Sequence, residues 1–180
     1  MMFPKFAWMR NQNDDVRDII SIFLESRANT RWVLCHRKII FSDAQLWTAW
    51  QASIRKFERG SALARSLDAE FLRYLAGTHH ISEAFKRAGC SSKDQRGWLI
   101  YLPEATFTTQ DHAAQIKEIH LDDMEPQAIE LLQQMGCALD VQDFEGTVEG
   151  LNQLGIDDIG KQTNFEQIAI SQIHYADLQN

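Results

Sequence analysis

Residues 68–89, DAEFLRYLAGTHHISEAFKRAG, predict two helices joined by a tight turn. The first helix is expected over 68–76, and three of its apolar side chains fall at helical spacing: Phe71, Leu72 and Leu75. Gly77 follows directly, and glycine in this place commonly ends a helix in the left-handed conformation. The turn therefore closes the first helix and leads into the second.

The second helix is expected over 81–88, with Gly89 at its end. Three apolar residues are predicted to share its inner side: Ile81, Phe85 and Ala88. Residues 97–102 then form a continuous apolar run closed by Pro103, which is typical of a strand buried on both faces. This part of the chain thus predicts helix, turn, helix and strand.

Upstream, Asn13 to Asp15 form an acidic start for an amphipathic helix that ends near residues 27–30. Residues 31–35, RWVLC, are short, aromatic and β-branched, so they predict a buried strand. Ser42 and Gln45 match a capping box, which predicts a helix from there to Gly60. One helix is therefore expected before this strand and another after it.

Downstream, the pattern is less regular. Residues 110–121 fit either a helix or an edge strand, 126–135 predict a helix, and 144–154 a short amphipathic segment. Residues 164–178 predict a terminal helix with an Asn cap. One stripe of this helix is apolar, formed by Phe165, Ile168, Ala169, Ile173 and Ala176, and three more apolar residues leave it: Ile170, Tyr175 and Leu178.

A terminal helix that is apolar on two sides requires burial twice, either within its own fold or beneath a partner. Both possibilities stay open at this point. Together the elements predict an α/β (α+β mixed) fold: one domain over 1–180, helix-rich, with a small mixed or antiparallel sheet flanked by helices. The chain has no Pro/Gly/Ser-rich linker and no internal repeat to divide it.

Three cysteines, Cys35, Cys90 and Cys137, are far apart and odd in number, so they predict neither a disulfide framework nor a zinc knuckle. A reducing compartment suits this usage. No run of about 18 apolar residues occurs, so no membrane partner is expected. We expect an intracellular, cytoplasmic protein, also nuclear if its source is eukaryotic.

Charge is divided unevenly along the chain, although the net charge is -7. Residues 27–96 carry 13 Lys or Arg against 6 Asp or Glu, whereas residues 97–180 carry 2 against 15. Phosphate binding requires clustered cations, and residues 27–96 supply them, so an acidic protein can still present a local basic face. The alternative is solvated charge with pairing between the two halves.

The usual motifs of catalysis are missing from the sequence. No Walker loop, G-x-G-x-x-G, G-x-S-x-G or H-E-x-x-H string occurs. His79 and His80 form the only adjacent histidine pair, but neighbouring helical residues point about 100° apart and suit one metal ion poorly. We therefore expect no enzyme activity, no cofactor and no metal.

The segment from Glu70 to Gly89 resembles the signature of the KEOPS kinase-binding subunit family. In that family a helix ends in small-Gly-Thr, a basic or amide pair follows, and Ile-Ser-Glu-Ala opens the next helix before a glycine and a buried strand. The sequence departs from this pattern at His79 and His80, where Arg and Gln are usual, and residues 104–160 are longer and more acidic than expected.

This resemblance implies a non-catalytic adaptor with two direct partners. One is the small atypical kinase/ATPase of KEOPS, and the other is the tRNA that the complex modifies to N6-threonylcarbamoyladenosine, whose 3′ end the archaeal members hold. Other KEOPS subunits would be contacted indirectly. The kinase interface is expected at Ile168, Ile170, Ile173 and Leu178. RNA contacts are expected at Arg55, Lys56, Arg59, Arg65, Arg73, His79, His80, Lys86 and Arg87.

Two other functions compete with the adaptor. A stand-alone RNA-binding module would need the same cations but no protein partner. A small-ligand or metal enzyme would instead use the turn at His79 and His80.

Overall fold

The computed structural model describes residues 1–12, 17–107, 114–117, 120–141, 144, 146–160 and 164–178. The helices among them are α1 (Ile19–Ser26), the 3-10 helix η1 (Arg37–Ile39), α2 (Asp43–Glu58), α3 (Leu67–Ala76), α4 (Ile81–Ala88), α5 (Leu121–Gln134), α6 (Val148–Gln153) and α7 (Phe165–Leu178). The strands are β1 (Lys5–Arg10), β2 (Trp32–His36), β3 (Arg96–Tyr101), β4 (Ala105–Phe107), β5 (Ala114–Ile116) and β6 (Cys137–Leu139).

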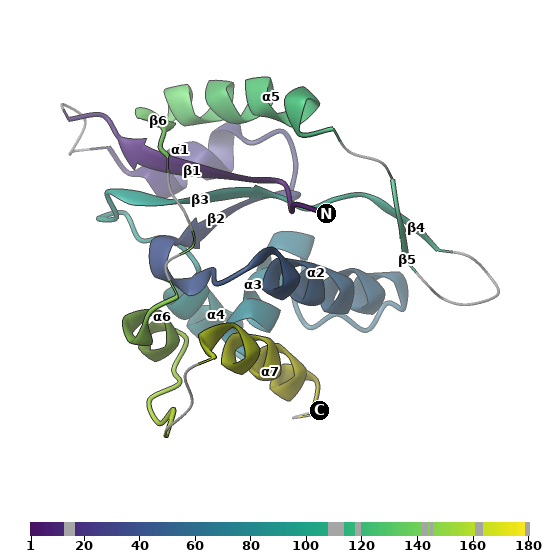
Figure 1. The fold of residues 1–180 in the computed structure, drawn as a ribbon. Helices are drawn as coiled ribbons and strands as arrows, with labels where there is room; N and C mark the ends of the chain where they lie inside the picture. The colour runs from purple at the N-terminus through teal and green to yellow at the C-terminus, as the bar shows by residue number, and fades with distance from the viewer. Residues whose placement is uncertain are drawn as a thin grey trace.

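Four strands form an antiparallel sheet in the order β2-β3-β1-β6. Leu99 of β3 pairs with Leu34 of β2 and with Phe6 of β1, so β3 is an inner strand; β1 is the other, because it pairs with both β3 and β6. Figure 1 shows the sheet between two helical layers, with α1 and α5 on one side and α2, α3 and α4 on the other. The predicted α/β fold with helices flanking a small sheet is confirmed, and the sheet is antiparallel.

The alternation of side chains along the strands builds a separate core on each face of the sheet. Ala7, Val33 and Ile100 pack into the core beneath α2 and α3. Trp8 and Leu99, which point the other way, pack into the core beneath α1 and α5. Both faces are therefore covered, which explains why β3 reads as an uninterrupted apolar run.

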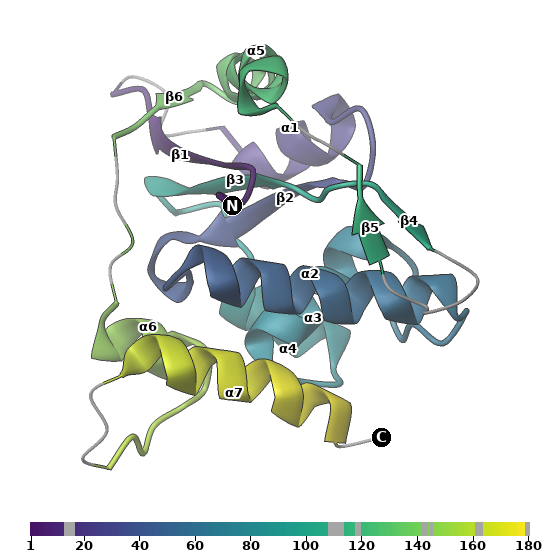
Figure 2. The same ribbon diagram turned by 45° about the vertical axis from the view of Figure 1, so that its right-hand side comes forward.

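Helix α3 is enclosed on every side, and all ten of its residues are buried. It packs against α2, α4, α7 and β2. Figure 2 shows α3 behind α2, with α7 on the far side of the helical layer from the sheet. A helix in this position must pair its polar side chains internally, because water cannot reach them.

Local signals placed most helix ends correctly. Ser42 Oγ accepts the Gln45 N–H at 3.1 Å and begins α2, while Gly60 follows its last turn with a φ of +64°. The first helix begins at Ile19, capped by Asp18, and not at the acidic run before it; residues 13–16 lie outside the described residues. Within the described parts of the chain, no helix is long and apolar enough to cross a membrane.

Three sequence predictions need correction. Phe85, expected to face inward on α4, is 45% exposed, and Ala84 and Ala88 make the buried side instead. The fifth α-helix begins at Leu121, before Pro126; of the ambiguous 110–121 segment, residues 114–116 form β5, and residues 110–113 and 118–119 lie outside the described residues. Strands β1, β4 and β6 had no counterpart among the predicted elements.

Candidate functional site

The turn between α3 and α4 is where the terminal helix α7 is seated. Gly77 adopts the predicted left-handed conformation, with a φ of +59°. A Cβ at this position would lie 2.6 Å from Gln172 Cδ of α7, and Gln172 Nε2 donates a hydrogen bond to the Ala76 carbonyl oxygen at 3.5 Å. The turn therefore needs glycine for two reasons: its backbone conformation and the close approach of α7.

Arg73 lies within α3 and is fully buried, so the expectation that it contacts RNA is corrected. Its Nη2 lies 2.6 Å from Glu70 Oε1, and its Nη1 donates to the Thr78 carbonyl oxygen at 3.3 Å. Burial by itself lowers the pKa of Arg73, but the hydrogen bond and charge of Glu70 more than offset it and the pKa is raised. Arg73 is an internal anchor for the turn.

Tyr74 joins α3 to the end of α7. Its hydroxyl donates to Asp177 Oδ1 at 2.6 Å, and Lys56 Nζ of α2 lies 3.6 Å from the same oxygen. Burial and the neighbouring Asp177 carboxylate raise the pKa of Tyr74 above its ordinary value. Lys56 thus already has an anionic partner within the protein.

Helix α7 presents two faces with different environments. Ala169, Ile173 and Ala176 are buried against the helical layer, so Ile173 belongs to the core and not to an exposed interface. Ile168 is half-buried against the same core. Three other apolar residues lie outside this buried stripe: Ile170, which is half-buried beside it, Tyr175, 52% exposed, and Leu178, 80% exposed.

We call Ile170, Tyr175 and Leu178 the outer face of α7. These are the three apolar residues that leave the main stripe in the sequence. Ile170 and Leu178 remain candidates for a partner interface, and Tyr175 joins them because of its exposure. Tyr175 and Leu178, three residues apart on α7, are exposed neighbours, and adjacent exposed apolar side chains are typical of a surface that a partner covers.

A second candidate surface lies at the C-terminal end of α2. The cations Arg55, Arg59 and Arg65 are exposed there, and no carboxylate of the described residues forms an ion pair with any of them. A pocket of about 460 Å³ lies beside Arg65. Figure 2 shows the C-terminal ends of α2 and α7 on the same side of the molecule.

This pocket brings together side chains from distant parts of the sequence. Arg31, Phe57 and Phe107 line it with Arg65. Arg31 donates to the carbonyl oxygens of Leu102 and Pro103, at 3.0 and 2.8 Å. Phe107 belongs to β4, in the acidic part of the chain. Apart from its aromatic side chain, nothing in the sequence indicated that Phe107 would line a pocket beside Arg65. Cations beside aromatic rings suit phosphates and unstacked bases.

The remaining predicted RNA contacts lie around α4. Arg87 is engaged by Glu83 at 2.8 Å and by the Leu154 carbonyl oxygen at 3.3 Å, whereas Lys86 is exposed and lies 4.0 Å from Glu83. His80 is exposed and precedes the first turn of α4, while the Nε2 of His79 is buried without a hydrogen-bond partner. These residues are not gathered at the end of α2.

The described residues offer little to a metal or a nucleophilic mechanism. No group of three or more His, Cys, Asp or Glu side chains among them could hold a metal ion. Burial raises the pKa of the Cys35 and Cys90 thiols, which keeps them protonated and unreactive.

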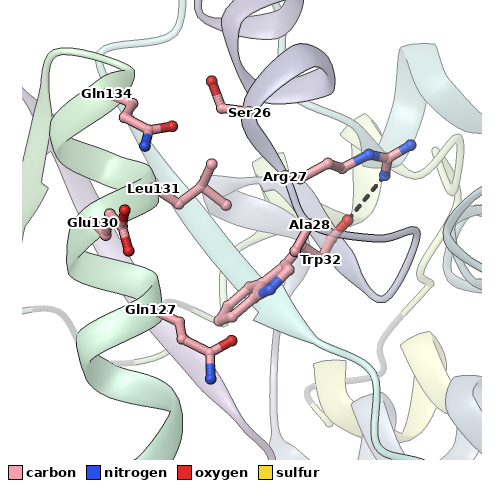
Figure 3. A pocket seen from close by; sticks show the side chains of 8 residues that line it. All are labelled: Ser26, Arg27, Ala28, Trp32, Gln127, Glu130, Leu131 and Gln134. Carbon is pink, nitrogen blue, oxygen red and sulfur yellow. Dashed lines mark hydrogen bonds between the residues drawn. The ribbon is translucent and has the colours of Figure 1, made fainter.

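A further pocket, of about 220 Å³, lies on the opposite side of the sheet between α1 and α5. Figure 3 shows Gln127, Glu130, Leu131 and Gln134 along α5, with Ser26, Ala28 and the Trp32 indole across the pocket from that helix. Arg27 also borders the pocket, but its guanidinium donates to the Trp32 carbonyl oxygen at 3.0 Å and to Asp68 at 2.6 Å.

Comparison with known proteins identifies the family. The family model described as kinase binding protein CGI-121 matches residues 10–174, which covers nearly all of the elements described above. A search of curated proteins finds no match. The match agrees with the resemblance carried by residues 70–89, and we conclude that the chain belongs to the CGI-121 kinase-binding protein family, the KEOPS subunit family.

Proposed function

We propose that this chain is the non-catalytic KEOPS subunit that binds and regulates the complex's small atypical kinase/ATPase. We further propose that it helps to recruit tRNA, through its 3′ end, for N6-threonylcarbamoyladenosine modification, and that it meets other KEOPS subunits only indirectly. The family carries the kinase partner, and the exposed outer face of α7 is the observation on this chain that supports it.

The outer face of α7 is suited to a protein partner because its apolar groups stand on a rigid support. Ile173 and its buried neighbours hold the helix, and Gln172 rests on Gly77. Leu178 and Tyr175 project from this frame into solvent. Burying exposed apolar side chains of this size contributes roughly 1.5–3 kcal/mol each, so a few of them can dominate an interface.

Leu178→Arg tests this surface, because the side chain is exposed and its replacement leaves the core unchanged. We expect affinity for the cognate kinase to fall at least about tenfold when the apolar contact is replaced by a charge. The measurement is titration calorimetry with both proteins purified. Val141→Arg is the matched control, since Val141 is fully exposed beyond β6.

Equal kinase affinities for the Leu178→Arg and Val141→Arg variants would remove the outer face of α7 from the interface. Complete failure of the unaltered chain to co-elute with the kinase at micromolar concentration would count against the proposed function as a whole. Ile173→Arg is not used, because a buried charge would disturb the fold itself.

We place the tRNA contacts at the end of α2, around Arg55, Arg59 and Arg65. Arginine can form paired hydrogen bonds with a phosphate and can also stack on an unpaired base. The adjoining pocket adds the rings of Phe57 and Phe107, on which a base can stack. Lys56 and Arg87 contribute less, because each is engaged within the protein.

The double variant Arg59→Glu/Arg65→Glu should weaken tRNA binding and flatten its dependence on salt, since fewer counterions are released. Lys93→Glu is the control for charge, because Lys93 is exposed in the loop after α4. If the double variant binds tRNA as the control does, the end of α2 is not the RNA surface. Tight tRNA binding without any kinase affinity would instead favour the stand-alone RNA-binding module.

A further inference from the structure

The pocket between α1 and α5 faces away from both proposed surfaces. Residues of α1 and α5 line it, and Figure 1 shows these two helices on the far side of the sheet from α2 and α7. A ligand there would leave the outer face of α7 and the end of α2 free. The pocket therefore serves neither of the contacts assigned above.

The tryptophan at the base of the pocket has an unused hydrogen-bond donor. The indole N–H groups of Trp47, Trp50 and Trp98 each donate to a backbone carbonyl oxygen at 3.0–3.1 Å. Trp32 is only 2% exposed, yet none of the described residues accepts a hydrogen bond from its Nε1. This Nε1 also differs from that of Trp8, which is enclosed by protein. A buried indole usually has an acceptor, so the Trp32 N–H is available to a ligand.

Four other side chains around the pocket can accept hydrogen bonds, and the amide N–H group of one of them, Gln127, already donates to the Asp123 carbonyl oxygen. Glu130 contributes a carboxylate, Gln127 and Gln134 contribute amide oxygens, and Ser26 contributes a hydroxyl. Among the described residues no ion pair forms at Glu130. Helix α5 carries four carboxylates and no Lys or Arg, so the surroundings are anionic. The Arg27 guanidinium is neutralised by Asp68.

From this arrangement we infer that the pocket between α1 and α5 binds an arginine side chain presented by a second protein partner. A guanidinium carries five N–H donors in one plane and keeps its charge, which suits a carboxylate flanked by amide and hydroxyl oxygens. Glu130 takes the charge of the guanidinium. The Trp32 N–H donates to a backbone carbonyl oxygen of the arriving segment. A lysine ammonium would offer only three donors and leave acceptors unused.

The probe for this site is N-acetyl-L-arginine methylamide, titrated into the full chain labelled with ¹⁵N. The indole N–H signal of Trp32, assigned with Trp32→Phe, should shift and saturate in the millimolar range expected of so small a ligand. N-acetyl-L-citrulline methylamide has nearly the same shape without the charge. It should bind at least about fivefold more weakly, because the ion pair is lost.

Glu130→Gln should weaken the arginine probe by about fivefold, whereas Glu125→Gln, on the same helix but outside the pocket, should change it less than about twofold. Three results would each overturn the inference: no shift of the Trp32 signal up to about 50 mM, equal binding of the citrulline compound, or equal effects of the two Gln variants. None of these results concerns kinase or tRNA binding, so the proposed function is tested independently of this inference.

Discussion

Replacing Gly77 by alanine should separate the two reasons for a glycine at the turn. The left-handed conformation costs an alanine roughly 1–2 kcal/mol, and about 0.4–1 kcal/mol of that is recovered because the unfolded chain loses freedom. The new methyl would also lie 2.6 Å from Gln172 Cδ, so the Gln172 side chain must move. Losing its hydrogen bond to Ala76 and its packing adds about 1 kcal/mol.

The expected loss of unfolding free energy is therefore about 2 kcal/mol, or about 4–8 °C in the thermal midpoint for a chain of this length. Gly60→Ala is the matched control. Gly60 also follows a helix and has a φ of +64°, but nothing lies within 4 Å of the added Cβ. Its loss should stay near 1 kcal/mol or below.

The contribution of the contact between residue 77 and Gln172 can be measured by urea unfolding of four proteins. These are the unaltered chain, Gly77→Ala, Gln172→Ala and the double variant. If Gln172 causes the additional loss, the Gly77→Ala cost should fall by about 1 kcal/mol when Gln172 is already alanine. Equal costs in both backgrounds, or equal costs for Gly77→Ala and Gly60→Ala, would refute the seating of α7 on the turn.

Three other predictions follow from buried polar groups. Arg73→Ala should lower the unfolding free energy by about 3–5 kcal/mol in a urea titration, because Glu70 is left buried without its partner. Tyr74→Phe should lower the unfolding free energy by about 1–2 kcal/mol at neutral pH, because the hydrogen bond to Asp177 is lost. The Tyr74 pKa is raised in the folded protein, so above pH 10 the unfolded chain loses the phenol proton more readily and the unaltered protein loses stability. The Phe variant has no such proton and should lose less stability over the same range. Burial lowers the pKa of His36, so the unfolded chain binds a proton more readily; stability should fall as pH drops below 6.5, and His36→Asn should flatten this decline in thermal scans at pH 5–7.

Helix ends were predictable because their signals are local. Ser42 caps α2 through its own hydroxyl, and Gly60 and Gly77 end their helices through a backbone conformation that glycine tolerates best. None of these features depends on residues far away in the sequence. The same holds for the two-sided pattern of α7, whose separation into a buried stripe and exposed residues was visible in the spacing of its apolar residues.

Strands β1 and β6 were not predictable in the same way. Residues 5–10, KFAWMR, send Ala7 to one core and Trp8 to the other, so no alternation of polar and apolar residues marks the strand. β6 has only three residues and exists because β1 lies beside it. The expectation for Arg73 failed for a related reason: helical spacing predicts one inward face, whereas α3 is enclosed all round and pairs Arg73 with Glu70.

Pairing of charges limited what the sequence could say about the surfaces. Lys56 and Asp177 are more than a hundred residues apart, and their proximity follows only from the packing of α7 beside α2. Arg55, Arg59 and Arg65 are exposed, in line with the basic character of the segment that holds them. The pocket beside Arg65 needs Phe107 from β4, which only the folded chain brings near.

The place of β1 in the sheet affects how the protein is made in a cell. This strand leaves the ribosome before its hydrogen-bonding neighbours, β3, about 90 residues later, and β6, about 130 residues later. The apolar side chains of β1 therefore remain exposed to water while the residues up to β3 and β6 are synthesised, at roughly 5–20 residues per second. Newly made chains should consequently depend on chaperones for several seconds, and long-range strand pairing should make their folding slow.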